Sequence, residues 1–392
     1  MRKIKVMHIV YLFELGGIES FILQLCNNID LNRYELYLVT LINEKLGQIH
    51  LFNSNVNIIS LDFKQGDIRS FRGGAKTLNG LVNVIDTVKP DIIHSHHEHY
   101  VSFFIQLASK LSKQKVVNVR TVHSGGSFYA KQETLSDYIK LLIEKVTFKL
   151  FDVNLVAVSQ AIYKNNIKYF SNIAKSNALI YNGVDINVFD KNKYSYVSRQ
   201  FFGFDKDAIV YVYVARLNPG KNHEFLISQW NRVVSLLPGA ILVFAGDGPL
   251  KMDLKNKIIG SALERHIYML GSIDNVPELL SVADIGVFPS QFEGMSISLL
   301  EKFAMQLPVV ASDIEAFTNV ANDKLDSFLI PLEDQNQFVN MLIKLGQDVP
   351  LRKEIGSKAY KTAVNYSLEK TILSYEKLYD QIAEKNYGIG IL

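Results

Sequence analysis

The sequence predicts an α/β protein built from two doubly wound domains, each with a parallel sheet between layers of helices. Short apolar runs that suit buried strands alternate with longer helical segments in the first half of the chain. The same alternation starts again in the second half, and it indicates a parallel sheet covered on both faces. The length of 392 residues also exceeds what a single hydrophobic core usually supports.

The candidate strands and helices follow one another in a regular order. In the first half we expect strands at KVMHIVYL, YELYLVTLI, VNIISLDF, DIIHSH, VVNVRTVHS, VNLVAVS and NALIYNGV, with helices at SFILQLCNNI, TLNGLVNVIDTV and SFFIQLASKL. In the second half the expected strands are IVYVYVARL, AILVFAGDG, IYMLGS, IGVFPS and PVVASD, and the helices are EFLISQWNRVVSLL, LLSVADI, SISLLEKFAMQ and QFVNMLIKLGQ. A polar stretch joins the halves near residue 190, so we expect the two domains to face each other across a ligand-binding cleft.

Composition and charge exclude several classes of protein. With 48% hydrophobic and 21% charged residues the chain is typical of a globular protein, and its formal net charge of +3 is too small for a dedicated nucleic-acid binder. The single cysteine, Cys26, excludes an internal disulfide and suits a reducing compartment. No apolar run approaches the roughly 20 residues that span a bilayer, and MRKIKVMHIVYLF is a poor signal peptide. We therefore expect a cytoplasmic protein that could still lie on the inner face of the cell membrane.

Two glycine motifs follow candidate strands. In LGGIES, Gly16 and Gly17 let the backbone approach a ligand, and the helix that follows offers free N–H groups to an anion. A tight turn is the alternative interpretation, because LGGIES is not a full GxGxxG fingerprint. In FAGDGPL, Gly246 and Gly248 are ordinary turn residues, and their interest lies in their position at the same sheet edge as the next motif.

A pair of basic residues follows the first strand of the second half, in VYVARLNPGKN. Arg216 stands at the expected carboxyl end of the strand, and Lys221 stands on the loop after it. Because an arginine binds phosphate oxygens in a fork, the two cations suit a diphosphate. Solvated surface charges are the alternative interpretation.

Two glutamates, Glu293 and Glu301, frame the stretch FEGMSISLLE. If Ser296 or Ser298 caps a helix, Glu293 precedes that helix and Glu301 lies within its first turns. The helix start can then hold a phosphate, while each carboxylate accepts hydrogen bonds from hydroxyl groups. A sugar, a diphosphate and a ribose in a row is the ligand with that layout. An exposed loop acid beside a helix surface acid is the alternative.

Histidines cluster in DIIHSHHEHY at positions 94, 96, 97 and 99, and His123 ends a later strand. Alternating positions share a strand face, as in some metal sites, but no cysteine and no second group of carboxylates accompanies the cluster. We therefore expect no metal and no other cofactor. His123 could meet a sugar hydroxyl or serve as an acid or base, and a structural histidine is the alternative.

The chain resembles one known family, the retaining, nucleotide-sugar-dependent glycosyltransferases of the GT4 family, which have the GT-B fold. The family's order of motifs is present as LGGIES, DIIHSHHEHY, RTVHSG, AVSQA, YNGVDINVF, VARLNPGKN, FAGDGPL, LLSVADIGVFPSQFEGMSISLLE and PVVASDI. Glu293 and Glu301 match the E-x7-E signature of that family. The resemblance implies an acceptor-side domain at 1–188, a nucleotide-sugar domain at 189–366, and final helices at about 367–392 that cross back to the first domain.

The resemblance also implies roles for single residues. Arg216 and Lys221 would hold the donor diphosphate, and Glu301 would bind the ribose hydroxyls. Glu293 would meet hydroxyls of the transferred sugar, and His123 would contact that sugar near the reacting carbon. The remaining implied donor-binding positions are Gly16, Gly17, Gly246, Gly248, Gly294, Met295 and Ser296. A UDP-sugar is the expected donor, although SIDNVPELL, where the base would lie, does not distinguish uracil from another base.

The expected reaction is metal-independent and retains anomeric configuration. Two cations and a helix N-terminus would stabilise the charge on the leaving phosphate. No carboxylate stands where a retaining glycosidase places its nucleophile, so a same-face reaction is expected, with the leaving phosphate helping to deprotonate the acceptor. A non-hydrolysing sugar-nucleotide epimerase, a dinucleotide oxidoreductase and a catalytically silent transferase partner are the competing interpretations.

The acceptor is expected to be a glycan or a lipid-linked oligosaccharide of bacterial surface polysaccharide biosynthesis, as in many members of the family. The stretch YIKLLIEKVTFKLF combines apolar positions with Lys140, Lys145 and Lys149, as in a helix that lies on an anionic lipid surface. An ordinary amphipathic helix that faces the core is the alternative.

Overall fold

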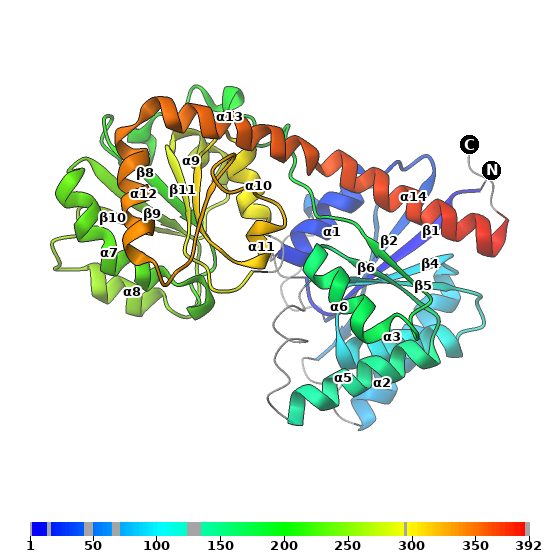
Figure 1. The fold of residues 1–392 in the computed structure, drawn as a ribbon. Coiled ribbons are helices and arrows are strands. Elements are labelled where there is room, and N and C mark those ends of the chain that lie inside the picture. The colour runs from blue at the N-terminus through cyan, green and yellow to red at the C-terminus, as the bar shows by residue number, and fades with distance from the viewer. Residues whose placement is uncertain are drawn as a thin grey trace. The chain divides into compact units, whose positions relative to one another are not determined.

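The computed structural model describes residues 2–13, 17–42, 50–64, 71–123, 135–293 and 296–388. The chain divides into two compact units, unit 1 (Met1–Asn182 with Glu369–Leu392) and unit 2 (Gly183–Leu368). Each unit contains one parallel sheet with helices against it (Figure 1), so the predicted α/β fold with two parallel sheets is confirmed.

Unit 1 is built on a seven-stranded sheet in the order β3-β2-β1-β4-β5-β6-β7. Its strands are β1 (Ile4–Val10), β2 (Tyr34–Ile42), β3 (Asn57–Phe63), β4 (Ile92–Ser95), β5 (Val117–Val122), β6 (Val153–Ala157) and β7 (Ser176–Leu179). Its helices are α1 (Gly17–Asn28), α2 (Phe71–Val88), α3 (His99–Leu111), α5 (Leu135–Leu150), α6 (Gln160–Phe170) and α14 (Leu368–Tyr387), the last belonging to unit 1 from Glu369 onward.

Unit 2 is built on a six-stranded sheet in the order β10-β9-β8-β11-β12-β13. Its strands are β8 (Ile209–Val214), β9 (Ala240–Ala245), β10 (Ile267–Gly271), β11 (Ile285–Phe288), β12 (Val309–Ser312) and β13 (Phe328–Ile330). Its α-helices are α7 (His223–Leu236), α8 (Lys251–Ile258), α9 (Val276–Val282), α10 (Ile297–Ala304), α11 (Glu315–Thr318), α12 (Gln335–Gln347) and α13 (Val349–Asn365). Three short 3-10 helices precede or follow β8: η3 (Lys191–Tyr194), η4 (Arg199–Phe202) and η5 (Pro219–Lys221).

The hydrophobic pattern found most strands but missed several elements. The strand β13 is only three residues long, so its apolar run does not stand out from its surroundings. The helices α6 and α13 each bury only a few side chains, so their apolar residues form no long stripe. The hydrophobic pattern therefore predicts an element that is buried along a whole face. It does not predict an element that buries only a few side chains.

The two faces of the unit 1 sheet are covered by different helices. Apolar side chains of β1, β2 and β4 pack with α2 and α3 on one face, among them Met7, Ile9 and Ile93. On the other face, His94 of β4 contacts two tyrosines of α14, Tyr375 and Tyr379. Because side chains alternate along a strand, His8 of β1, the partner of His94 in the sheet, lies on this second face as well.

A buried ion pair joins the sheet of unit 1 to its helices. Arg120 on β5 and Glu144 on α5 both have no exposed side-chain surface, and their side chains form a salt bridge. Glu144 also accepts a hydrogen bond from the backbone N–H of His99. Burial alone would raise the pKa of Glu144, but Arg120 and the bonds from His99 outweigh that effect and lower the pKa to about 2. The carboxylate is therefore charged at neutral pH.

We expect Arg120→Met to lower the free energy of unfolding by about 3–5 kcal/mol, because it leaves the carboxylate of Glu144 buried without its partner. Urea unfolding followed by circular dichroism measures the loss. Lys257→Met is the matched control, because its salt bridge to Glu224 is half exposed and contributes at most about 1 kcal/mol. Equal losses in the two variants would contradict this account of the buried pair.

Candidate functional site

The loops after β8, β9 and β11 meet at one edge of the unit 2 sheet. These strands are neighbours and parallel, so their carboxyl ends lie together. The backbone N–H of Leu217 donates to the carbonyl of Asp247 at 2.9 Å, and that of Gln291 donates to the carbonyl of Gly220 at 2.9 Å. The loop that carries Arg216 and Lys221 is thus held between the two others.

The glycines of FAGDGPL are required by this close packing of backbones. Gly246 has a φ of +145°, and a Cβ there would lie 2.0 Å from the carbonyl oxygen of Ala215. A Cβ on Gly248 would lie 2.4 Å from the carbonyl oxygen of Leu217. Both glycines therefore let the loop after β9 touch the cationic loop. Their predicted contact with a donor stays a prediction.

The two basic residues of the loop have different surroundings. The Arg216 side chain is exposed and has no ion-pair or hydrogen-bond partner within the described part of the chain. The Lys221 ammonium lies 2.5 Å from a carboxylate oxygen of Glu293, and the two side chains are 18% and 10% exposed. Lys221 and Glu293, which the sequence motifs assign to different parts of a ligand, therefore form an ion pair with each other.

Glu293 is oriented by two residues that the sequence analysis missed. The hydroxyl of Ser290 donates to Oε1 of Glu293 at 2.9 Å. The hydroxyl of Tyr213, on β8, lies 2.8 Å from that of Ser290 and donates to the carbonyl of Lys221 at 2.9 Å. Both residues are buried, Tyr213 within β8 and Ser290 two residues after β11, so nothing in the local sequence marks them as polar partners of the site.

The helix α10 begins beside Glu293 and carries Glu301. Ser296 occupies the N-cap position but its side chain makes no capping bond. Ser298 lies inside the helix and donates to the carbonyl of Val214 at 3.0 Å, so the expectation that it might cap the helix is wrong. The half-buried Glu301 has a raised pKa because burial disfavours its charge. Gly294 and Met295 lie outside the described residues.

A buried lysine, Lys302, follows Glu301 directly and was also missed. Its ammonium lies 3.0 Å from the hydroxyl of Ser298 and 4.3 Å from the ring centre of Phe288. Gly286 makes room for its stem, because a Cβ there would lie 2.5 Å from Cδ of Lys302. Burial lowers the pKa of Lys302 to about 7, against the opposing charges of Glu301 and Glu293. The sequence feature that indicates a buried lysine here is its position inside the apolar run SLLEKFAM.

In unit 1, Gly17 begins α1 and Gly16 lies outside the described residues. A Cβ added to Gly17 would meet none of the described atoms within 4 Å, so packing within the described chain does not require a glycine there. Its predicted approach to the donor phosphates stays a prediction. His123 follows the last residue of β5 and is half buried.

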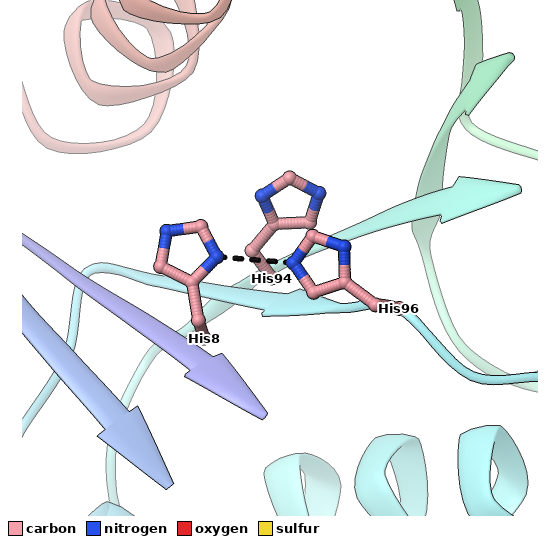
Figure 2. A group of neighbouring side chains, drawn as sticks. All are labelled: His8, His94 and His96. Atoms are coloured by element: carbon pink, nitrogen blue, oxygen red, sulfur yellow. Dashed lines mark hydrogen bonds between the residues drawn. The ribbon is translucent and has the colours of Figure 1, made fainter. Parts of the chain in front are cut away.

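Four histidines of unit 1, His8, His94, His96 and His123, gather near Phe21 of α1 and Tyr375 of α14. His8, which belongs to none of the sequence motifs, lies on β1 opposite His94 of β4 (Figure 2). Nδ1 of His8 lies 3.0 Å from Nε2 of His96, and Nδ1 of His96 lies 3.1 Å from Nε2 of His123. His94 instead contacts the hydroxyls of Tyr379 at 2.6 Å and Thr121 at 2.8 Å.

This histidine cluster does not fit a metal well. Ligand atoms of His8, His94 and His96 lie within 4.8 Å of one another. Every ring nitrogen of the three, except Nε2 of His8, already takes part in a hydrogen bond. An ion would have to replace those bonds, and no carboxylate belongs to the group of described residues that could hold it. The imidazoles are better described as a buried hydrogen-bond network.

The helices described in the structure include none that combines the length and the apolar character needed to cross a bilayer.

Comparisons with known proteins agree with this architecture. A family model described as Glycosyltransferase Family 4 matches residues 15–188, and one described as Glycosyl transferases group 1 matches residues 197–362. The UDP-Gal:alpha-D-GlcNAc-diphosphoundecaprenol alpha-1,3-galactosyltransferase of Escherichia coli is 25% identical over 98% of both chains. The N-acetyl-alpha-D-glucosaminyl L-malate synthase of Bacillus anthracis is 22% identical over 74% of both chains.

Solved structures show the same fold. The Anabaena protein HepE in complex with UDP and glucose superposes with a TM-score of 0.78 at 17% identity, covering 96% of this chain and 99% of that one. Sucrose-phosphate synthase from Thermosynechococcus elongatus gives a TM-score of 0.79 at 16% identity, covering 98% of this chain and all of that one. The two family models together match most of the chain, one in each half. The chain therefore belongs to the glycosyltransferases with the GT-B fold.

Proposed function

We propose that this glycosyltransferase moves a sugar from a UDP-sugar to a lipid-linked oligosaccharide in bacterial surface polysaccharide synthesis, with retention of configuration and without a divalent metal. The observation that carries the proposal is the cationic loop after β8, in which exposed Arg216 and paired Lys221 stand beside the start of α10. The E. coli relative, named for a UDP-galactose donor and a diphosphoundecaprenol-linked acceptor, supports the choice of donor and acceptor.

The Lys221–Glu293 pair suggests how the donor would be held. An incoming diphosphate competes with Glu293 for the Lys221 ammonium, and Arg216 adds a second charge without breaking an existing pair. Glu293 stays in place through Ser290 and becomes free to accept hydrogen bonds from sugar hydroxyls. The first turn of α10 lies at the same loop edge, since Ser298 donates to the carbonyl of Val214, and a helix N-terminus favours an anion.

The proposed reaction breaks the bond between the anomeric carbon and the phosphate oxygen, and the bonding electrons leave with the UDP. The acceptor hydroxyl oxygen forms the new bond on the same face, and its proton passes to a phosphate oxygen of the departing UDP. Arg216 and Lys221 stabilise the negative charge that grows on that phosphate, because both stand on a loop whose backbone is held by its neighbours. No covalent sugar–enzyme intermediate is required.

The first test is a panel of nucleotide sugars, measured by release of the nucleoside diphosphate. We expect UDP release from a UDP-sugar, and a fall in kcat/KM of about 100-fold or more in both Arg216→Ala and Lys221→Ala, because each removes a charge that stabilises the leaving group. Lys206→Ala, which removes an exposed lysine in the turn before β8, is the control and keeps the parent rate. Near-parent rates in both site variants would refute the site assignment.

Chelation tests the metal-free part of the proposal. We expect excess EDTA to leave the initial rate within about twofold of the untreated rate, because the charge on the leaving phosphate is balanced by side chains. Among the described residues, the histidine group is the only cluster of three potential ligands, and it contains no carboxylate of the kind that magnesium needs. A loss of activity that Mg²⁺ or Mn²⁺ restores would disprove metal independence.

The helix α5 supports the membrane part of the proposal. Its buried residues Leu141, Glu144, Thr147 and Phe148 face the core. The opposite side carries a stripe of exposed apolar side chains at helical spacing: Leu135, Tyr138, Ile139, Leu142, Val146 and Leu150. Lys145 and Lys149 lie beside this stripe and are exposed. An apolar stripe with flanking lysines suits the surface of an anionic bilayer.

We expect the parent protein to sediment with vesicles that contain phosphatidylglycerol, and Leu142→Glu to bind them about tenfold more weakly, because it places a charge in the apolar stripe. Leu236→Glu on α7 is the matched control, since Leu142 and Leu236 are both 60% exposed. The control should bind like the parent. The membrane assignment fails if the parent does not bind, or if both variants lose binding equally.

A further inference from the structure

Three histidines of unit 1 form a continuous row of hydrogen-bonded imidazoles. His8 comes from β1, His96 follows the end of β4, and His123 follows the end of β5. These strands are neighbours in the sheet, so the row runs across it toward the carboxyl edge. The two linking distances are 3.0 Å from His8 to His96 and 3.1 Å from His96 to His123. In Figure 2, His8 and His96 point toward each other beside His94.

The row is built to stay neutral. Burial lowers the pKa of His8 and of His123 to about 3, and it lowers the pKa of His96 well below the ordinary value. The other titratable groups around the row are His94, His97, Tyr375 and Tyr379, and Phe21 of α1 covers His96 and His123. Each of the three rings therefore carries a single hydrogen at neutral pH.

A row of neutral imidazoles allows only two hydrogen-bond directions. If His8 donates from Nδ1, His96 accepts at Nε2 and donates from Nδ1, so His123 accepts at Nε2 and carries its hydrogen on Nδ1. If the direction reverses, His123 donates from Nε2 and its Nδ1 has a free lone pair. The position of one hydrogen on His8 therefore fixes the position of the hydrogen on His123.

The surroundings of His8, at the inner end of the row, favour one of the two hydrogen-bond directions. Nε2 of His8 is buried and has no hydrogen-bond partner among the described residues. In the reversed direction this nitrogen would carry an N–H group with no acceptor, and orphaned N–H groups are rarer in protein interiors than under-used acceptors. The favoured direction is therefore the one that leaves Nε2 of His8 without a hydrogen.

We propose that His8 and His96 are positioning residues that fix the tautomer of His123, so that His123 presents an Nδ1–H donor at the carboxyl edge of the unit 1 sheet. The use of this donor rests on the proposed sugar transfer, in which His123 contacts the donor sugar. An N–H at that nitrogen donates to a sugar oxygen and does not remove a proton. His123 thus orients the sugar, which agrees with the departing phosphate as the group that accepts the acceptor's proton.

The tautomer can be measured directly on the full chain labelled with ¹⁵N-histidine, whose nine histidines give a tractable spectrum. Two-bond ¹⁵N–¹H correlations distinguish hydrogen on Nδ1 from hydrogen on Nε2, and the His123→Gln spectrum assigns the signal of His123. We expect Nδ1–H on His123 in the parent and its loss in His96→Phe, which removes both links of the row. His96→Asn should retain it, because the Asn amide N–H takes the place of Nδ1. Nε2–H on His123 in the parent would overturn the proposal.

The same variants separate this inference from the proposed function. Where the parent transfers sugar, we expect His96→Phe to lower kcat about tenfold, the effect of one hydrogen bond, with the donor KM changed less than about twofold, and His96→Asn to restore kcat. A merely structural role for His96 would instead give Phe and Asn variants with equal kcat, which would contradict the proposal. A parent that releases no nucleoside diphosphate refutes the proposed function, while the tautomer spectrum still decides the inference.

Discussion

Parallel strand pairing is the constraint from which the functional loops of this protein follow. Strands that pair in parallel must return through helices, so both faces of each sheet become covered and every strand ends at the same edge. In unit 2 this gathers the loops after β8, β9 and β11, and backbone hydrogen bonds between them fix the cationic loop. In unit 1 it aligns the histidines of β1, β4 and β5 on one face. Side chains far apart in sequence thus meet because their strands are neighbours.

Burial on both faces has a second consequence, because polar groups inside such layers need partners. Arg120 and Glu144 satisfy each other, His8, His96 and His123 bond to one another, and His94 bonds to Tyr379 of α14. In each case the low-dielectric surroundings decide the charge state. The carboxylate of Glu144 stays ionised beside a guanidinium, while His8, His96 and His123 stay neutral because burial disfavours their charged form. The charge state of each of these buried groups is therefore set by the side chains packed around it.

The Lys221–Glu293 pair links the electrostatics of unit 2 to its use. A half-buried lysine would be costly to leave unpaired, and Glu293 satisfies Lys221 through an ion pair. The hydroxyl of Ser290 also donates to Glu293 and helps to hold that carboxylate in position. Lys302, directly behind the helix start, adds a titratable charge whose state depends on the same two glutamates. The protonation of Lys302 therefore depends on the charges of Glu301 and Glu293.

The amino-acid sequence by itself determined the α/β class, the two sheets and most of their strands, because a strand buried on both faces is an uninterrupted apolar run. It also indicated the cationic loop, the glycines of FAGDGPL and the two glutamates, since their residue types follow strand ends. Only the tertiary structure decided that Lys221 pairs with Glu293 through a loop supported by Tyr213 and Ser290, and that His8 joins the histidines of later strands. The Lys221–Glu293 and His8–His96 contacts join residues far apart in the sequence, and no local pattern records which strands become neighbours.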